Sequence, residues 1–167
     1  MSTGISPAVR WTAFACAAAL GSLSATGCTR TRAAIDPCAL VPVAEAQSLD
    51  ATIEKVQRMP PDPREKNELC LYFDDAGERR LMVFYWPDRA KDVAAHVRGS
   101  LGADGSVVDV PRVGDAAAAG YRGGELRLFA AANARGMIGV RARDAIREGD
   151  PAFGALTAMV ERALHRL

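Results

Sequence analysis

An uncharged apolar run near the amino terminus decides which part of this chain can form a folded domain. Residues 11–23 (WTAFACAAALGSL) carry no charge, and Arg10 supplies a positive charge just before them. A basic start followed by about 7–15 apolar residues is typical of a secretory signal peptide. A membrane-spanning helix needs about 20 apolar residues, more than this run provides. We therefore predict that residues 1–27 are a signal peptide and that the folded domain lies after them.

Small residues and a cysteine follow the apolar run. Residues 24–27 (SATG) precede Cys28, a pattern that resembles the lipobox of bacterial lipoproteins. In that family the cysteine receives acyl chains such as palmitate and becomes the first residue of the mature protein. The lipobox usually has leucine three residues before the cysteine, where this chain has Ala25. The resemblance implies lipid attachment at Cys28; the alternative is cleavage by an ordinary signal peptidase and a protein free of the membrane.

A lipid anchor at Cys28 would hold the exported protein at the extracytoplasmic face of a membrane. Two acyl chains anchor a protein stably, whereas one chain binds only marginally. We predict that residues 28–37 form a polar tether, which at about 3.5 Å per residue reaches at most about 35 Å. The folded domain, residues 38–167, would therefore stay close to the bilayer, in the periplasm or at the cell surface.

The part of the chain after the signal peptide is electrically balanced. Arg10 is the only charged residue among the first 27, so the remaining 140 residues hold 20 basic and 20 acidic side chains. A nucleic-acid-binding domain needs a concentrated basic surface, and we therefore expect no nucleic-acid partner. The chain is 49% hydrophobic and 25% charged, as in globular proteins. Its length suffices for a single folded domain.

Two of the four cysteines remain for the domain itself, Cys38 and Cys70, because the others lie in the signal peptide and at the anchor position. Export places this pair in an oxidising compartment, so we predict a structural disulfide between them. A redox-active pair is the alternative, although the close CxxC spacing of such pairs is absent. The two histidines, His96 and His165, show no zinc-ligand spacing with these thiols. We predict no metal site and no cofactor.

The first half of the domain is predicted to contain a short helix and three strands. Pro42 suits the first turn of a helix over residues 41–49. Alternating or apolar segments predict strands at residues 53–58, 69–73 and 81–86. We expect residues 59–67 to be an exposed loop, because three prolines there cannot take part in a strand ladder. The segment 81–86 is apolar throughout, which indicates an inner strand covered on both faces.

The second half is predicted to contain two helices and three or four strands. Asp88 is a candidate cap for a helix whose apolar stripe runs from Ala90 to Leu101. Strands are expected at residues 107–110, 125–132 and 137–143. Residues 114–120 fit either a helical turn or a bent strand. Asp150 is the expected N-cap of a final helix over residues 151–167.

This order of elements predicts the fold class. Strand pairs joined by short polar turns, with helices before, between and after them, indicate an α+β domain. We expect a single antiparallel sheet of about six or seven strands, helices packed on it, and one disulfide.

Three short motifs give the chain a resemblance to a group of small secreted lipoproteins of high-GC bacteria. They are residues 36–40 (DPCAL), 70–72 (CLY) and 113–117 (VGDAA). The resemblance covers most of residues 36–167. It implies a Cys38–Cys70 disulfide and a fold similar to the α/β sandwiches of the photosystem PsbP type. It implies no catalytic residues.

Candidate catalytic groups are few in the domain. None of its serines lies in a GxSxG nucleophile motif. His96 and His165 are expected to be solvated helix side chains. The adjacent carboxylates Asp74 and Asp75 suit a hairpin turn before a glycine. We therefore predict that the protein is not an enzyme.

One group of arginines is a candidate anion-binding site. Arg127, Arg141 and Arg143 fall in the last predicted hairpin, shortly after Arg122, and Arg141 and Arg143 share a strand face. The alternative is a set of solvated charges neutralised by acidic residues nearby in sequence, which are Glu125, Asp144 and Glu148.

These observations predict a lipid-anchored lipoprotein of the cell envelope. Its domain would bind a partner protein or another envelope component without catalysis. The second hypothesis is a domain that binds a lipid or a small ligand in a groove between sheet and helices. Tyr72, Tyr85 and Trp86 are expected in the core or at the rim of such a groove. An enzyme is the third hypothesis.

Overall fold

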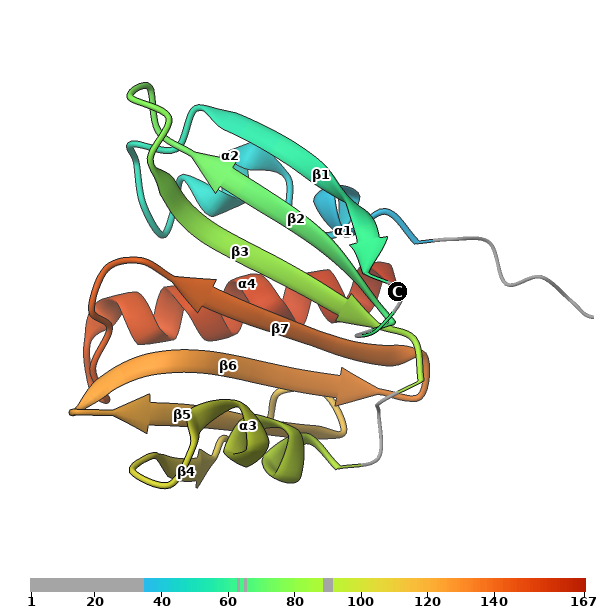
Figure 1. The fold of residues 1–167 in the computed structure, drawn as a ribbon, viewed down its shortest axis with the longest axis vertical. Helices are drawn as coiled ribbons and strands as arrows, with labels where there is room; N and C mark the ends of the chain where they lie inside the picture. The colour runs from blue at the N-terminus through green and yellow to red at the C-terminus, as the bar shows by residue number, and fades with distance from the viewer. Residues whose placement is uncertain (1–34, 63, 65, 89–91) are drawn as a thin grey trace, which may run out of the picture. The chain divides into compact units, whose positions relative to one another are not determined.

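The computed structural model describes residues 35–167, apart from residues 63, 65 and 89–91 (Figure 1). The predicted signal peptide, Cys28 and residues 28–34 of the predicted tether lie outside the described residues. The helices and strands are, in chain order, α1 (Pro37–Leu40), α2 (Val43–Ala46), β1 (Lys55–Asp62), β2 (Asn67–Phe73), β3 (Arg79–Trp86), α3 (Val93–Leu101), β4 (Ser106–Asp109), β5 (Ala116–Arg122), β6 (Glu125–Asn133), β7 (Gly136–Ala142) and α4 (Pro151–Arg166). Within the described part of the chain, no helix is long and apolar enough to span a membrane.

All seven strands belong to one antiparallel sheet, in the order β1-β2-β3-β7-β6-β5-β4. Two sequential groups of strands, β1–β3 and β4–β7, meet where β3 pairs with β7, with Val83 opposite Val140. The last strand in sequence therefore lies at the centre of the sheet. This architecture confirms the predicted α+β class with a single antiparallel sheet and packed helices.

Helices α1, α2 and α4 cover one face of the sheet. Leu156 and Met159 of α4 pack against Val83 and Val140 in the larger of the two hydrophobic clusters. All four side chains are fully buried. Burying an aliphatic side chain of this size stabilises the fold by about 1.5–3 kcal/mol. The apolar stripe predicted for the last helix thus forms much of the core.

Helix α3 lies on the opposite face, over β4, β5 and β6 (Figure 1). Its buried residues Val93, Val97 and Leu101 belong to the second hydrophobic cluster. The helix approaches the sheet closely at Gly120, where a Cβ atom would lie 2.5 Å from Cγ1 of Val97. Four alanines precede this glycine in β5, and small side chains permit such an approach. No described helix covers the β2–β3–β7 part of this face.

The strand over residues 81–86 is an inner strand, as predicted. Leu81, Val83 and Tyr85 belong to the cluster on the α4 side of the sheet, whereas Phe84 and Trp86 belong to the cluster on the α3 side. A strand points successive side chains to opposite faces, so an apolar residue at every position supplies both clusters. The two predicted hairpins, β2–β3 and β6–β7, are also confirmed.

A disulfide joins Cys38 and Cys70, whose Cα atoms are 5.2 Å apart. It fastens α1 to β2 and confirms the predicted pair. A buried hydrogen bond supports the same junction, because the hydroxyl of Tyr72 donates to the carbonyl oxygen of Val41 at 2.5 Å. Burial raises the pKa of the Tyr72 hydroxyl well above its ordinary value. Tyr72 is therefore a core residue rather than part of a binding surface.

The predicted loop over residues 59–67 is too long, because both of its ends belong to strands. Strand β1 continues through Pro60 and Pro61 to Asp62, and β2 begins already at Asn67. Strand β1 is the edge of the sheet, and its pairing with β2 becomes irregular between Met59 and Asp62. Proline is tolerated on an edge strand because the N–H that it lacks need not serve a second neighbour.

The helix predicted over residues 41–49 is shorter than expected, and a second short helix precedes it. Helix α2 covers Val43–Ala46 only, with Pro42 at its N-cap. The preceding segment forms the helix α1, whose cap is the Asp36 carboxylate accepting from the N–H of Cys38 at 3.0 Å. Both helices are too short to be stable alone and depend on packing against the sheet.

The cap of α3 differs from prediction, whereas the N-cap of α4 is the predicted residue, Asp150. Asp92, not Asp88, caps α3, since its carboxylate accepts a hydrogen bond from the N–H of Ala95 at 3.0 Å. Ala90 of the predicted stripe lies outside the described residues. Asp150 occupies the N-cap of α4, but its carboxylate accepts from the preceding loop, at the N–H of Arg147. An aspartate can cap only where its carboxylate reaches the first helical turn.

The segment 114–120 belongs mainly to a strand, which settles the choice between strand and helical turn. Strand β5 begins at Ala116 and contains an irregular pairing with β6 between Gly120 and Tyr121. The β5–β6 hairpin turns at Gly123 and Gly124, both with positive φ, which glycine adopts without strain.

An ion-pair cluster joins α2 to α4. Glu45 pairs with Arg166 and, at 3.3 Å, with Arg162, and Arg166 also donates to the carbonyl oxygen of Leu40 at 2.7 Å. The hydrogen bond from Arg166, together with the positive charges of both arginines, holds the pKa of Glu45 below its ordinary value of 4.5. The cluster therefore stabilises the fold only while Glu45 is ionised.

Acid should weaken this cluster. Because the pKa of Glu45 is lower in the folded than in the unfolded state, its contribution is present above about pH 5 and disappears as the pH falls through the folded-state pKa. We expect Glu45→Gln to lower the free energy of unfolding by about 0.5–1 kcal/mol at pH 7 and by clearly less at pH 3. Urea unfolding at both pH values measures this. Glu161→Gln, on the exposed side of α4, is the control; equal losses from Glu45→Gln at both pH values would contradict the assignment.

Candidate functional site

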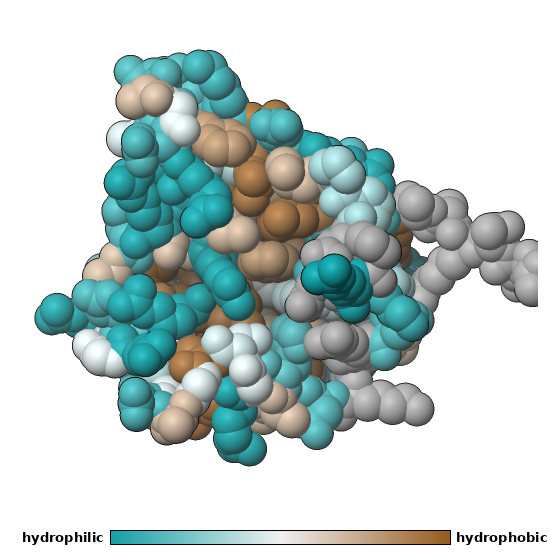
Figure 2. All heavy atoms as spheres, viewed as in Figure 1, coloured by the Kyte–Doolittle hydropathy of each residue, from teal (hydrophilic) through white to brown (hydrophobic). Residues whose placement is uncertain are grey.

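The uncovered β2–β3–β7 part of the α3-side face forms a groove. Figure 2 shows apolar residues gathered over β2 and β3, with hydrophilic residues around them. Leu69 and Phe84 are paired across β2 and β3, and so are Leu71 and Met82, so all four point to this face. Phe84 is largely buried, and the other three are only partly buried. An apolar strip that no helix covers and that polar residues surround is typical of a binding surface.

One end of the groove is a hollow of about 810 Å³, the arginine hollow, between the start of β3, the end of β7 and the β5–β6 turn. The three arginines predicted as an anion site, Arg127, Arg141 and Arg143, all line it. Three further arginines line the same hollow, namely Arg79, Arg80 and Arg122. Glu78 is the one carboxylate among the lining residues of this hollow. The topology thus brings together cations that lie far apart in the sequence.

Two of the predicted arginines carry exposed carboxylate partners. Arg127 pairs with Glu125 at 2.9 Å and Arg143 with Glu78 at 2.5 Å, and each arginine side chain is about half exposed. The partner of Arg127 was predicted, whereas that of Arg143 lies in the β2–β3 turn. Exposed ion pairs contribute about 0–1 kcal/mol to stability, so a bound anion can replace the carboxylate partner of either arginine at little cost in free energy.

Arg80 has a different role from the other arginines of the hollow. It donates to Asp50 at 2.6 Å and to Asp144 at 2.7 Å, and its side chain is only 18% exposed. Hydrogen bonding to Asp50 raises the pKa of Arg80. Arg80 therefore connects β3 to the segments that contain these two aspartates, and its role is structural.

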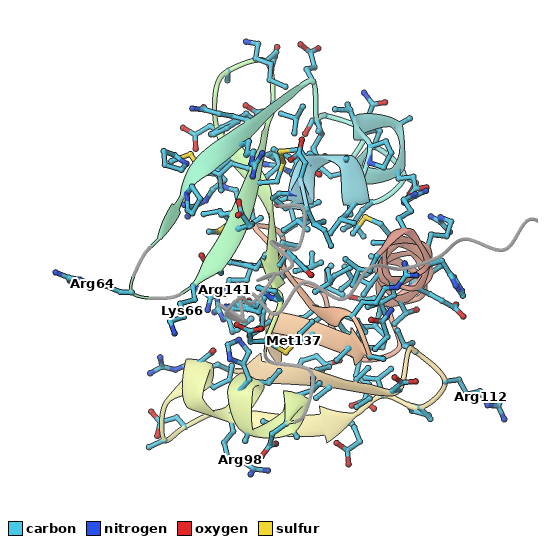
Figure 3. All side chains as sticks on the ribbon, turned by 90° about the vertical axis from the view of Figure 1, so that its right-hand side faces the viewer. Arg64, Lys66, Arg98, Arg112, Met137 and Arg141 are labelled. Atoms are coloured by element: carbon cyan, nitrogen blue, oxygen red, sulfur yellow. A yellow bond between two sulfur atoms is a disulfide. The ribbon has the colours of Figure 1, made fainter. Side chains whose placement is uncertain are left out.

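Arg141 occupies the middle of the groove. Its guanidinium lies over the ring of Phe84, 5.3 Å from the ring centre, and no described carboxylate lies within ion-pair distance of it. Figure 3 shows Arg141 between the β1–β3 part of the sheet and α3. Stacking on an aromatic face orients the planar guanidinium and leaves its edge donors for a carboxylate or a phosphate.

The other end of the groove is a smaller hollow of about 430 Å³, the aromatic hollow. Phe84 and Trp86 stack with ring centres 5.2 Å apart, and His96 meets the Trp86 ring edge-on at 4.5 Å. Asn67 and Leu69 of β2 complete the wall opposite α3. No acidic residue lines this hollow within the described part of the chain.

The prediction for His96 is wrong. It was expected as a solvated side chain on the outer side of its helix, but it is partly buried against Trp86. Helix α3 lies over β5 and β6, so the side of the helix that carries His96 faces the uncovered β2–β3–β7 part of the sheet. Tyr85, predicted with Trp86 as a core or rim residue, points to the opposite face and belongs to the core there. By contrast, His165 is exposed, as expected.

The other candidate catalytic groups have structural roles. Asp74 stabilises the β2–β3 turn, since its carboxylate accepts from the N–H of Glu78 at 2.7 Å, and Asp75 bonds to the N–H of Ala76. Within the described residues, no three acidic, histidine or cysteine side chains are grouped as metal ligands. The groove itself is suited to binding an anion beside an apolar group.

No protein-family model, no curated protein and no solved structure matches this chain.

Proposed function

We propose that this protein is a lipid-anchored lipoprotein of the cell envelope whose domain binds a small envelope molecule in the groove, without catalysing a reaction. Two adjoining hollows on the uncovered part of the sheet carry this proposal. Their volumes are those of small-molecule sites, which are commonly about 300–1,000 Å³. This geometry favours a ligand-binding domain over one that docks a partner protein.

The anchor supports the proposal from the side of the sequence. A diacylated Cys28 and a tether of about 35 Å at most would keep the groove near the membrane surface. Molecules that leave or enter that surface would then meet the groove at high local concentration. A binding domain on a short tether gains from this proximity without further contacts.

Intact-mass analysis of the protein purified from its own cell envelope tests the anchor. We expect a chain that begins at Cys28, carries acyl chains and lacks two hydrogens because of the Cys38–Cys70 disulfide. The control is Cys28→Ala, which should lack the acyl mass and leave the membrane fraction. A wild-type mass without acyl chains would refute the anchored form.

Native mass spectrometry of the same preparation tests ligand binding. We expect a fraction of the protein to carry an additional small-molecule mass that disappears in Gly99→Leu. Gly99 lies on α3 and lines the aromatic hollow, and a Cβ placed there meets nothing within 4 Å, so leucine would occupy the hollow without a backbone clash. Gly154→Leu on α4 is the matched control, since it too has open space. Equal ligand mass in both variants would count against the groove as the site.

A further inference from the structure

The two hollows lie next to each other. Arg141 and Ser100 line both of them, so a single ligand can extend from one hollow into the other. The ends differ in character. Six arginines and one carboxylate line the arginine hollow, whereas Leu69, Phe84 and Trp86 line the aromatic hollow beside uncharged polar residues and a single arginine, Arg141. A ligand that satisfies both ends must carry negative charge at one end and apolar surface at the other.

The balance of charge at the arginine hollow favours an anion. Arg80 is held by Asp50 and Asp144, and Arg122, Arg127 and Arg143 each have one exposed partner. For Arg79 and Arg141, no described carboxylate lies within ion-pair distance. A guanidinium binds carboxylates and phosphates through two parallel hydrogen bonds. An anion at Arg141 would therefore add a pair that the protein lacks.

The aromatic hollow contains an unsatisfied donor. Trp86 is 4% exposed, and its indole nitrogen is buried without a hydrogen-bond partner among the described residues. An unsatisfied buried donor costs about 1–3 kcal/mol. The indole forms part of the wall of the hollow. An acceptor oxygen on the apolar part of a ligand could recover this energy after a small shift of the surrounding side chains.

We propose that the groove binds one anionic amphiphile, with its phosphate or carboxylate head at Arg141 and its apolar chain over Phe84 and Trp86. This inference rests on the proposed function, since it names the ligand class of the same groove. The head interacts with the arginine hollow, and the chain replaces water over the half-buried apolar strip. Charge and apolar surface thus act together, and neither a free anion nor an uncharged amphiphile uses the whole groove.

Tryptophan fluorescence offers a direct measurement. The chain has two tryptophans, Trp11 in the predicted signal peptide and Trp86 in the groove. In a Trp11→Phe background, Trp86 is the sole tryptophan of the chain, whatever the processing. We would titrate the purified protein, in phosphatidylcholine nanodiscs, with dodecyl phosphate, dodecyl maltoside and inorganic phosphate, each below its micellar concentration where it has one.

We expect dodecyl phosphate to change Trp86 emission with an affinity at least tenfold higher than that of either other probe. Arg141→Gln should lower the affinity for dodecyl phosphate about tenfold or more and leave that for dodecyl maltoside unchanged. Arg98→Gln, an exposed arginine of α3 outside both hollows, is the matched control and should change neither (Figure 3). Arg141 is exposed, so its replacement does not threaten the fold.

Three outcomes would overturn the inference. Equal binding of dodecyl maltoside would show an apolar site without charge selection, and equal binding of inorganic phosphate would show a simple anion site. Equal loss in Arg141→Gln and Arg98→Gln would show nonspecific attraction. The proposed function fails separately, when native mass spectrometry finds no ligand mass and none of the three probes changes Trp86 emission.

Discussion

Replacing Cys38 and Cys70 together by alanine should lower the free energy of unfolding by about 3–4 kcal/mol. The two residues are 32 apart in sequence, and a cross-link of this span restricts the unfolded chain by about that amount in the chain-entropy model. The folded state suffers as well, because α1 has only four residues and is held to β2 by this bond. For a domain of this size the loss corresponds to a fall in Tm of about 10–15 °C.

Thermal and urea unfolding of the purified protein measure this loss. Alanine is preferred to serine because Cys70 is fully buried, and a buried hydroxyl without a partner would add a cost of its own. The reductant control compares both proteins with and without dithiothreitol. The wild type should fall to the level of the double variant, and the double variant should not respond. A loss below about 1 kcal/mol would show that packing alone holds α1 in place.

The parts of the fold that the sequence predicts are those decided by local patterns. The β2–β3 and β6–β7 hairpins and the final helix each depend on a short run of residues and its own turn or cap. The second half of β1, residues 59–62, was missed because Pro60 and Pro61 oppose a strand locally, and only the position of β1 at the edge of the sheet makes them tolerable. Tertiary context overrode a sound local argument there.

The candidate site could be predicted only in part for the same reason. Arg127, Arg141 and Arg143 share one hairpin, so their proximity is a local property. These arginines come close to Arg79 and Phe84 only because β3 pairs with β7. The two strands are about 50 residues apart, and no local sequence pattern predicts that they pair. Alternation along β3 does place Met82, Phe84 and Trp86 on one face of the sheet. This pattern is the sequence signal from which the aromatic hollow could have been predicted.

Replacing Gly114 by alanine should lower the free energy of unfolding by about 2–5 kcal/mol. Gly114 belongs to the VGDAA motif and has φ +60°, a conformation that costs other residues about 1–2 kcal/mol. A Cβ atom here would also lie 2.4 Å from the carbonyl oxygen of Ala132 and 2.8 Å from Cδ1 of Leu164. That carbonyl accepts a hydrogen bond from the N–H of Asp115, so it cannot move away freely. Overpacking of this kind costs about 1–3 kcal/mol more.

Gly123→Ala separates the two contributions. Gly123 has φ +62°, nearly the same conformation, but a Cβ atom there meets nothing within 4 Å. Its replacement should therefore cost only the conformational part, about 1–2 kcal/mol. Urea unfolding of both variants gives the difference, which measures the clash with β6 and α4. Equal losses would mean that β6 and α4 yield to the extra methyl group, and that the glycine of the motif serves only the turn before β5.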